Sequence, residues 1–249
     1  MTGTHKFHQQ TATKKADLDR LRPLAPNGLR NLEHVYNIEL TYTSNAIEGN
    51  TLTAAETQLV IEHGITIGGK PLKDHLEALD HHEALLYVRD IAQSTAAFTE
   101  FDVRTLHSLV LKRSVPDIAG RYADQGRFVL TDAGRHAFPS PAEVPALMGD
   151  FAAWLATAPD TPEAAFAAHV RLVAIHPFND GNGRTAGLLM NLILIRGGYP
   201  PVSIRPVDRP AYIAALQDPE AFDDFLYERL DAILTDFLGA LRQALPPSA

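Results

Sequence analysis

Hydrophobic side chains recur every three or four residues along most of this 249-residue chain, which is the spacing of α-helices that bury one face. The run 184–196 differs because it is apolar nearly all round, as expected of a helix buried on every side. The other segments with helical spacing are 31–47, 83–91, 102–112, 144–155, 161–175 and 221–245. The pattern therefore predicts a protein built mainly of helices.

Two short segments have the character of extended chain instead. Residues 128–130 and 136–138 flank the turn-forming sequence Asp132-Ala133-Gly134 and are followed by prolines, which predicts one small β-hairpin. Residues 65–67 also look extended. We expect an all-α fold, a helical bundle bearing this single hairpin.

Start and stop signals place a helix on either side of residues 176–183. Thr161 suits an N-cap and Pro162 suits the first turn, so one helix is expected to begin there and to end at His176. The next helix is expected to stop at Gly197 and Gly198. The segment between the two helices therefore lies at the start of a buried helix.

This segment has the residue types of a phosphate site. Gly181, Asn182 and Gly183 open the second helix, where unpaired amide N–H groups and the positive end of the helix dipole favour an anion. His176 can take a proton from a hydroxyl nucleophile, because histidine titrates near neutral pH. Phe178 is expected to point into the core.

Two charged residues complete the pattern. Asp180 can bind Mg²⁺, and Arg184 can neutralise phosphate charge with its guanidinium. The alternative is an ordinary helix–loop–helix turn, in which His176 caps one helix and Asp180 is the N-cap of the next. The coincidence of all these residues at one helix N-terminus favours the phosphate site.

Residues 176–184 resemble the signature of the Fic family, His-x-Phe-x-Asp/Glu-Gly-Asn-Gly-Arg-x-x-Arg. The resemblance implies transfer of AMP from Mg-ATP to a hydroxyl side chain of a target protein, by in-line attack on the α-phosphorus. It also implies roles for four residues: His176 as general base, Asp180 as Mg²⁺ ligand, Asn182 with the loop amides as phosphate cradle, and Arg184 at the β-phosphate.

The sequence departs from this signature at Gly187, where the second arginine is expected. By resemblance that arginine grips the γ-phosphate. Three alternatives follow: Arg205 or Arg209 substitutes for it, Mg²⁺ and solvent take its place, or the protein uses another nucleotide or has weak activity.

A second motif upstream includes Ser44, Glu48 and Gly49 and resembles the inhibitory motif of some Fic proteins. In such relatives the glutamate pairs with the second arginine and displaces the γ-phosphate. Because Gly187 replaces that arginine, Glu48 would turn to Arg184 or act by charge repulsion alone. The alternative is a solvated glutamate at a helix end.

The hairpin resembles the Fic flap, which aligns the backbone of a target protein. Its docking residues are expected to be Val129, Leu130, Thr131 and His136. Tyr212 could stack on adenine, or could simply be half-buried packing. The histidine-rich stretch 74–83 is interpreted as a charged helix face rather than a metal site, with His81 or His82 near the nucleotide.

Composition limits the remaining possibilities. The net charge of −8 argues against nucleic-acid and anionic-membrane binding, and the absence of cysteine excludes disulfides and thiol catalysis. A cytoplasmic location is expected, because no leader or membrane-spanning segment is visible. The expected partners are ATP and a target protein with a Ser, Thr or Tyr hydroxyl, and a homodimer is left open.

We divide the chain into a flexible lead-in over 1–30, an N-terminal helical region with the inhibitory motif over 31–95, and a Fic core with closing helices over 96–249. The predicted function is a protein adenylyltransferase that Glu48 inhibits. The alternatives are a nucleotide-gated binding protein of low activity, and a Fic variant that transfers another group or removes AMP.

Overall fold

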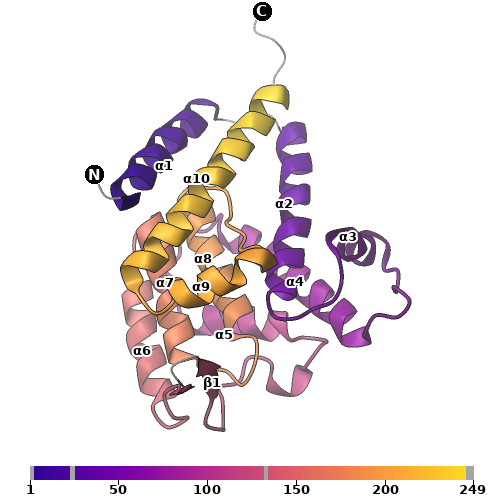
Figure 1. Ribbon diagram of the computed structural model, residues 1–249, viewed down its shortest axis with the longest axis vertical. Helices are drawn as coiled ribbons and strands as arrows, with labels where there is room; N and C mark the ends of the chain where they lie inside the picture. Colours follow the sequence, from indigo (N-terminus) through magenta and orange to yellow (C-terminus); the bar gives the residue numbers. More distant parts are fainter. Residues whose placement is uncertain (1–2, 23–25, 132–133, 245–249) are drawn as a thin grey trace, which may run out of the picture.

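The computed structural model describes residues 3–22, 26–131 and 134–244, and most of them are helical (Figure 1). The helices are α1 (Gly3–Arg20), α2 (Pro26–Ala46), α3 (Ala54–His63), α4 (Leu72–Ile91), α5 (Glu100–Val110), α6 (Val144–Leu155), α7 (Pro162–Ile175), α8 (Asn182–Arg196), α9 (Arg209–Ala215) and α10 (Pro219–Ala244), with short 3₁₀ turns at Pro116–Ile118 and Pro206–Asp208. This confirms the all-α prediction.

Helices α7 and α8 form the central pair of the bundle, and α4 and α5 pack against α8. All side chains from 188 to 194 in α8 are buried, as the apolar run predicted. Phe166 of α7 and Phe222 of α10 are 0% exposed in the same core. Helix α8 is therefore buried in the core of the bundle along much of its length.

Local signals explain where several helices begin. Thr161 accepts a hydrogen bond from the N–H of Ala164 and caps α7, with Pro162 at the first position, as the sequence predicted. Thr53 and Glu56 form a capping box at the start of α3, and Thr99 and Asp102 form another at α5.

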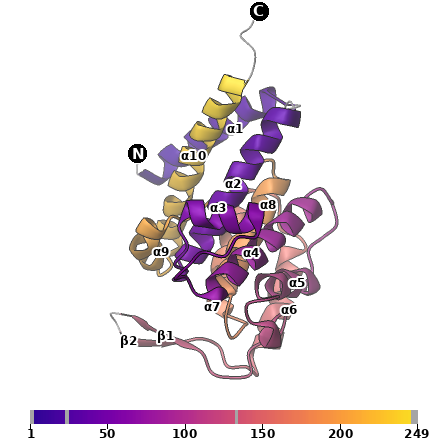
Figure 2. The same cartoon turned by 90° about the vertical axis from the view of Figure 1, so that its right-hand side faces the viewer.

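The hairpin consists of β1 (Phe128–Thr131) and β2 (Gly134–Ala137), paired antiparallel so that Phe128 faces Ala137 and Val129 faces His136. It projects from the end of the bundle opposite the C-terminus (Figure 2). The expected turn at 132–133 lies outside the described residues. Residues 65–67, which looked extended, form no strand.

The N-terminal segment differs from the flexible lead-in that the sequence suggested. Residues Gly3–Arg20 form α1, which lies along α10 (Figure 1). Leu18 is 1% exposed, and Lys14 forms an ion pair with Asp231 at 2.8 Å. Long-range packing stabilises this polar helix, and that contribution cannot be read from its own sequence.

Among the described residues, none of the helices combines the length and the apolar character that crossing a membrane requires.

Candidate active site

His176 ends α7 in a left-handed backbone conformation, with φ 50° and ψ 55°. It is the one non-glycine residue with positive φ in the described part of the chain. This conformation costs an L-residue roughly 1–2 kcal/mol, so the surrounding contacts must hold it. The N–H of His176 donates to the Leu172 carbonyl at 2.9 Å, and the side chain lines a cavity.

The imidazole of His176 stacks on Phe138, which follows the hairpin, with ring centroids 3.8 Å apart and planes 10° apart. Burial lowers the pKa of His176 to about 4, and the positive charge of Arg127 acts in the same direction. The Val173 carbonyl and Asp180 partly oppose this pKa shift. The ring is therefore neutral at physiological pH and is able to accept a proton.

Asn182, which was expected to contact phosphate, uses its side chain to close the loop. Its Oδ1 accepts a hydrogen bond from the N–H of Phe178 at 2.9 Å, and its Nδ2 donates to the Phe178 carbonyl at 2.8 Å. Phe178 is 0% exposed, as predicted. The side chain of Asn182 thus fixes the loop, while Gly183 lines the cavity.

His107 of α5 supports the same loop, and sequence reasoning missed it. The N–H of Gly120 donates to its Nδ1 at 2.9 Å, so its Nε2 carries the proton and donates to the Asp180 carbonyl at 2.9 Å. Its ring stacks on Phe178 with centroids 3.6 Å apart. Burial lowers the pKa of His107 to about 4, so this neutral tautomer persists.

Helix α8 begins without a side-chain cap. Gly181 is the N-cap residue with φ 74°, and no cap hydrogen bond from a side chain is formed there among the described residues. A Cβ at Gly181 would lie 3.4 Å from the His107 ring, which is ordinary contact, so it is the left-handed backbone conformation that favours glycine. An uncapped helix N-terminus favours an anion.

Glu48 lies beside this helix N-terminus. A Cβ added at Gly183 would collide with a carboxylate oxygen of Glu48. Helix α2 ends at Ala46, and the chain then turns through Gly49, whose φ is 100°. Ser44, one helical turn before Glu48, lines the same cavity. The fold therefore brings the upstream motif and the loop together.

The carboxylate of Glu48 is exposed to the cavity, but the surrounding protein still desolvates it. This desolvation raises the pKa of Glu48, and the guanidinium groups of Arg184 and Arg209 partly oppose the shift. The negative charges of Asp180 and Glu77 raise the pKa further. Glu48 therefore holds a proton at higher pH than an ordinary glutamate does.

Arg184 is 3% exposed and its guanidinium is already bound to carboxylates. Nη1 donates to Oε1 of Glu77 at 3.2 Å, and Nη2 donates to Oδ1 of Asp180 at 3.3 Å. Glu77 of α4, which the sequence did not single out, also accepts from Nδ2 of Asn50 at 3.1 Å through Oε2. Glu77 thus joins Arg184 to the turn that contains Glu48.

Asp180 is the candidate metal ligand. Its side chain is 45% exposed, and its Oδ1 accepts from the Gly181 N–H at 2.6 Å as well as from Arg184. No cluster of three or more acidic or histidine side chains suited to a metal occurs among the described residues. A single carboxylate fits Mg²⁺ that is bound mainly through substrate phosphates.

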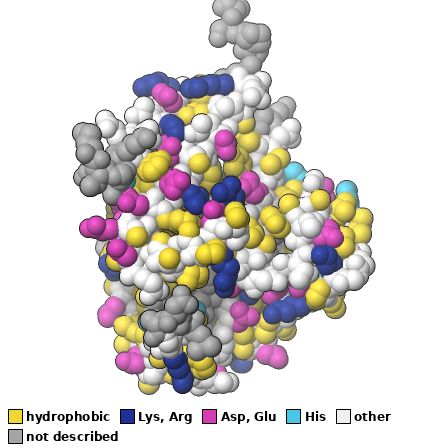
Figure 3. Space-filling view, in the orientation of Figure 1, with side chains coloured by type: hydrophobic (Ala, Val, Ile, Leu, Met, Phe, Trp, Pro, Cys, Tyr) yellow, Lys and Arg dark blue, Asp and Glu magenta, His cyan; other side chains and the backbone are white. Residues whose placement is uncertain are grey.

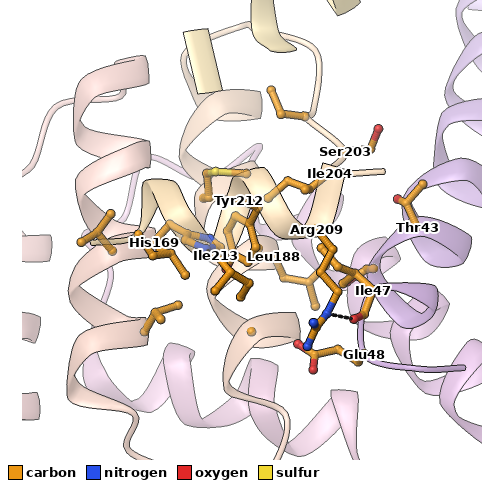
Figure 4. Close-up of a pocket in the computed structure, with 18 of the residues that line it drawn as sticks. Thr43, Ile47, Glu48, His169, Leu188, Ser203, Ile204, Arg209, Tyr212 and Ile213 are labelled. Carbon is orange, nitrogen blue, oxygen red and sulfur yellow. Dashed lines mark hydrogen bonds between the residues drawn. The ribbon is translucent and has the colours of Figure 1, made fainter. Parts of the chain in front are cut away.

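The cavity next to His176 has a volume of about 470 Å³ and lies between α2, α7, α8, α9 and the hairpin (Figure 4). Tyr212 lines it but is only 8% exposed, and its hydroxyl is 2.9 Å from Nε2 of His169. Burial raises the pKa of Tyr212. The ring can therefore form part of the cavity wall, which is compatible with adenine stacking.

The hairpin contributes Val129 and His136 to the cavity lining. Val129 is 42% exposed, and neither strand pairs with a third strand among the described residues. The backbones of Leu130 and Thr131 lie within β1, whereas their side chains lie outside the described residues.

The histidine-rich stretch of α4 has structural contacts. The N–H of Ile67 donates to Nε2 of His75 at 2.8 Å. The proton of the neutral ring is therefore on Nδ1, which donates to the Pro71 carbonyl at 2.8 Å. His81 lines the cavity, and burial lowers its pKa to about 3.

Gly187 lines the cavity, and a Cβ added there would meet nothing within 4 Å. Two arginines were considered as substitutes for the second arginine of the signature. Arg209 lines the cavity, whereas Nε of Arg205 donates to Asp208 at 2.9 Å.

Comparison with known proteins agrees with this geometry. The model of the Fic/DOC family matches residues 97–194, which include the loop and most of α8. The crystal structure of a Fic domain containing signaling protein from Bacteroides thetaiotaomicron superposes with a TM-score of 0.88 at 32% identity, covering 94% of this chain and 97% of that one. The chain belongs to the Fic/DOC family.

Two curated relatives of this Fic protein are named as enzymes. It is 43% identical to protein adenylyltransferase Fic of Nematostella vectensis over 69% of this chain and 40% of that relative. It is 34% identical to protein adenylyltransferase fic-1 of Caenorhabditis elegans over 81% of this chain and 41% of that relative. The chain therefore spans less than half the length of these relatives.

Proposed function

We propose that this Fic protein transfers AMP from ATP to a hydroxyl side chain of a target protein. The observation that supports the proposal most directly is the neutral imidazole of His176 at a cavity above the uncapped N-terminus of α8. In this reaction the hydroxyl oxygen bonds to the α-phosphorus, its proton passes to His176, and the bond to the β-phosphate oxygen breaks to release pyrophosphate.

The N-terminus of α8 and Arg184 would stabilise the phosphates. The helix amides are oriented before substrate arrives, so they cost no reorganisation during the reaction. Arg184 is held between Glu77 and Asp180, which fixes its position. Asp180 would hold Mg²⁺, whose positive charge neutralises charge on the pyrophosphate. Tyr212 would pack beside the adenine.

The hairpin would bind the target protein. Its strands are short and exposed, and a two-stranded hairpin offers backbone groups to an extended peptide. Val129 and His136 extend from the hairpin to the cavity that contains His176. A peptide along this hairpin would therefore place a Ser, Thr or Tyr hydroxyl near the base.

We further propose that Glu48 inhibits the transfer. Its carboxylate lies where the phosphates would approach the amides of α8, since a carboxylate oxygen occupies the space beside Gly183 that a Cβ would fill. It would therefore exclude the phosphates by occupancy and by charge repulsion. The absence of an arginine at Gly187 predicts inhibition without the ion pair that the family signature provides.

The transfer is tested by incubating the protein with Mg-ATP and candidate targets and measuring the added mass. A gain equal to AMP on the protein itself or on a target is expected, and it should disappear in His176→Ala. The exposed His63 provides a matched control, since His63→Ala should retain the adduct. Binding of ATP without any adduct would favour a nucleotide-gated binding protein, and a gain equal to phosphate would show a different transfer.

Inhibition is tested with two variants of one side chain. Glu48→Gly removes both the occupying group and its charge, whereas Glu48→Gln removes the charge alone. We expect at least about tenfold more AMP adduct for Glu48→Gly, because a few kcal/mol of repulsion are removed. The increase for Glu48→Gln should be smaller. Equal adduct in both variants and the parent would refute the inhibitory role.

A further inference from the structure

The cavity contains one cationic and one acidic side chain among its described lining residues, Arg209 and Glu48. Figure 4 shows both at the same corner of the cavity, with the guanidinium of Arg209 close to Ile47 and Glu48. A nucleotide with several phosphates brings multiple negative charges into this space. The position of the single cation therefore bears directly on where those phosphates lie.

The guanidinium of Arg209 is held in place but retains free donors. Its Nε donates to the carbonyl of Ile47 at 2.9 Å. Its two terminal nitrogens donate to no protein atom among the described residues. A guanidinium presents its donors in a rigid fork, so fixing Nε also fixes the direction of the other donors. The terminal nitrogens of Arg209 are thus available to an anion that enters the cavity.

The neighbouring arginines are already occupied. Arg205 binds both carboxylate oxygens of Asp208, at 2.9 and 3.4 Å, and does not line the cavity. Arg127 donates to the carbonyls of Gln125 and Pro139. In the space-filling view, basic side chains gather near the middle of the face where α9 lies (Figure 3). Of these candidates, Arg209 is the one that combines free donors with access to the cavity.

The wall of the cavity at Gly187 has no side chain. Gly187 lies four residues after Gly183 on α8 and therefore on the same side of the helix, and nothing lies within 4 Å of where its Cβ would be. We propose that Arg209 binds the phosphate farthest from the adenosine across this open space, and so determines the preference for a triphosphate. This inference rests on the proposed nucleotide transfer.

The same contact connects nucleotide binding to the inhibitory turn. Arg209 holds the carbonyl of Ile47, the residue before Glu48, and its charge counteracts the raised pKa of Glu48. The distal phosphate would therefore be attracted to the same positive charge that acts on the Glu48 carboxylate. Removing Arg209 weakens the binding of ATP and also loosens the turn, so the two effects must be separated by experiment.

The test measures the dissociation constants of ATP and AMP by titration calorimetry in the presence of Mg²⁺. The background is the double variant Glu48→Gly, His176→Ala, which removes both the competing carboxylate and turnover. In this background Arg209→Ala should weaken ATP about tenfold while changing AMP less than about twofold, because only ATP has the distal phosphate. Arg209→Gln, which keeps a polar side chain but removes the charge, should behave in the same way.

Arg205→Ala is the matched control and should leave the ratio of ATP to AMP affinity unchanged. Adding Gly187→Arg to Arg209→Ala should restore the affinity for ATP. The inference is overturned if Arg209→Ala and Arg205→Ala have the same ratio of ATP to AMP affinity, while the background variant binds ATP and the protein with His176 intact transfers AMP. If the background variant binds neither nucleotide, the proposed function itself fails and the inference falls with it.

Discussion

Two histidines with similarly lowered pKa values serve different purposes in this protein. Both nitrogens of His107 are used, one accepting from Gly120 and the other donating to Asp180. Nδ1 of His176 has no hydrogen-bond partner among the described residues, and its ring lines the cavity. Burial alone therefore does not identify a base; the accessible imidazole is the one suited to proton transfer.

The pKa of His176 predicts how AMP transfer depends on pH. Since the pKa is lowered to about 4, the ring is neutral from alkaline pH down to well below 6.5. We expect kcat/KM of Glu48→Gly to stay nearly constant between about pH 8 and about pH 6 and to decline only toward the lowered pKa. Initial rates across this range would measure it. Half-loss of activity near pH 6.5 would contradict the prediction.

The sequence singled out candidate site residues that lie in two short motifs. The structure places His176 of one motif and Glu48 of the other at the same cavity. His107 and Glu77 were missed, because their partners Asp180 and Arg184 are 73 and 107 residues away. Contacts of that range depend on how helices pack, and a single sequence does not reveal them.

At the scale of elements, two glycines near the start of α8 differ in the backbone conformation that they adopt. Gly181 needs a left-handed conformation next to the His107 ring, whereas Gly187 lies within regular helix with open space around it. The same residue type therefore has opposite consequences for stability six residues apart.

This contrast predicts opposite effects of two alanine substitutions. Gly181→Ala should lower the free energy of unfolding by roughly 1–2 kcal/mol, because it places a Cβ in left-handed backbone against His107. Gly187→Ala should raise it by up to about 1 kcal/mol, because alanine is the better helix former. Urea denaturation of both variants measures the difference. The backbone interpretation would be wrong if Gly181→Ala were as stable as the parent.

Element boundaries were predictable where caps and periodicity coincide. The N-cap at Thr161 and the end of α7 at His176 match the structure. Helix α3 was missed although Thr53 and Glu56 give it a capping box. Helix α1 was missed for a different reason: it is polar, and its stability comes from packing on α10.

At the scale of the whole molecule, the helical core encloses several neutral histidines. His81, His107 and His169 are at most 2% exposed. Burial lowers their pKa values from 6.5 to about 3, about 4 and about 4, respectively. The unfolded chain therefore binds protons that the folded protein excludes.

Because the unfolded chain binds more protons than the folded protein, the folded protein should lose stability in acid. Because the folded pKa values are depressed, the stabilisation is complete above about pH 6.5 and is lost as the pH falls toward 4. The raised pKa of Glu48 acts in the opposite direction. The free energy of unfolding should be at least about 2 kcal/mol lower at pH 5 than at pH 7. Urea titrations followed by circular dichroism would test this, and equal stability at both pH values would refute it.

The hydrogen bonds that the two carboxylate oxygens of Glu77 accept predict an order of folding. One accepts from Arg184 at the start of α8, the other from Asn50 after α2, and these segments meet only when α4 has docked between them. Closing a loop of 107 residues is entropically costly, so this junction should form late. A partly folded chain would then lack the proposed nucleotide cradle, and nucleotide binding would report on the fully assembled native state.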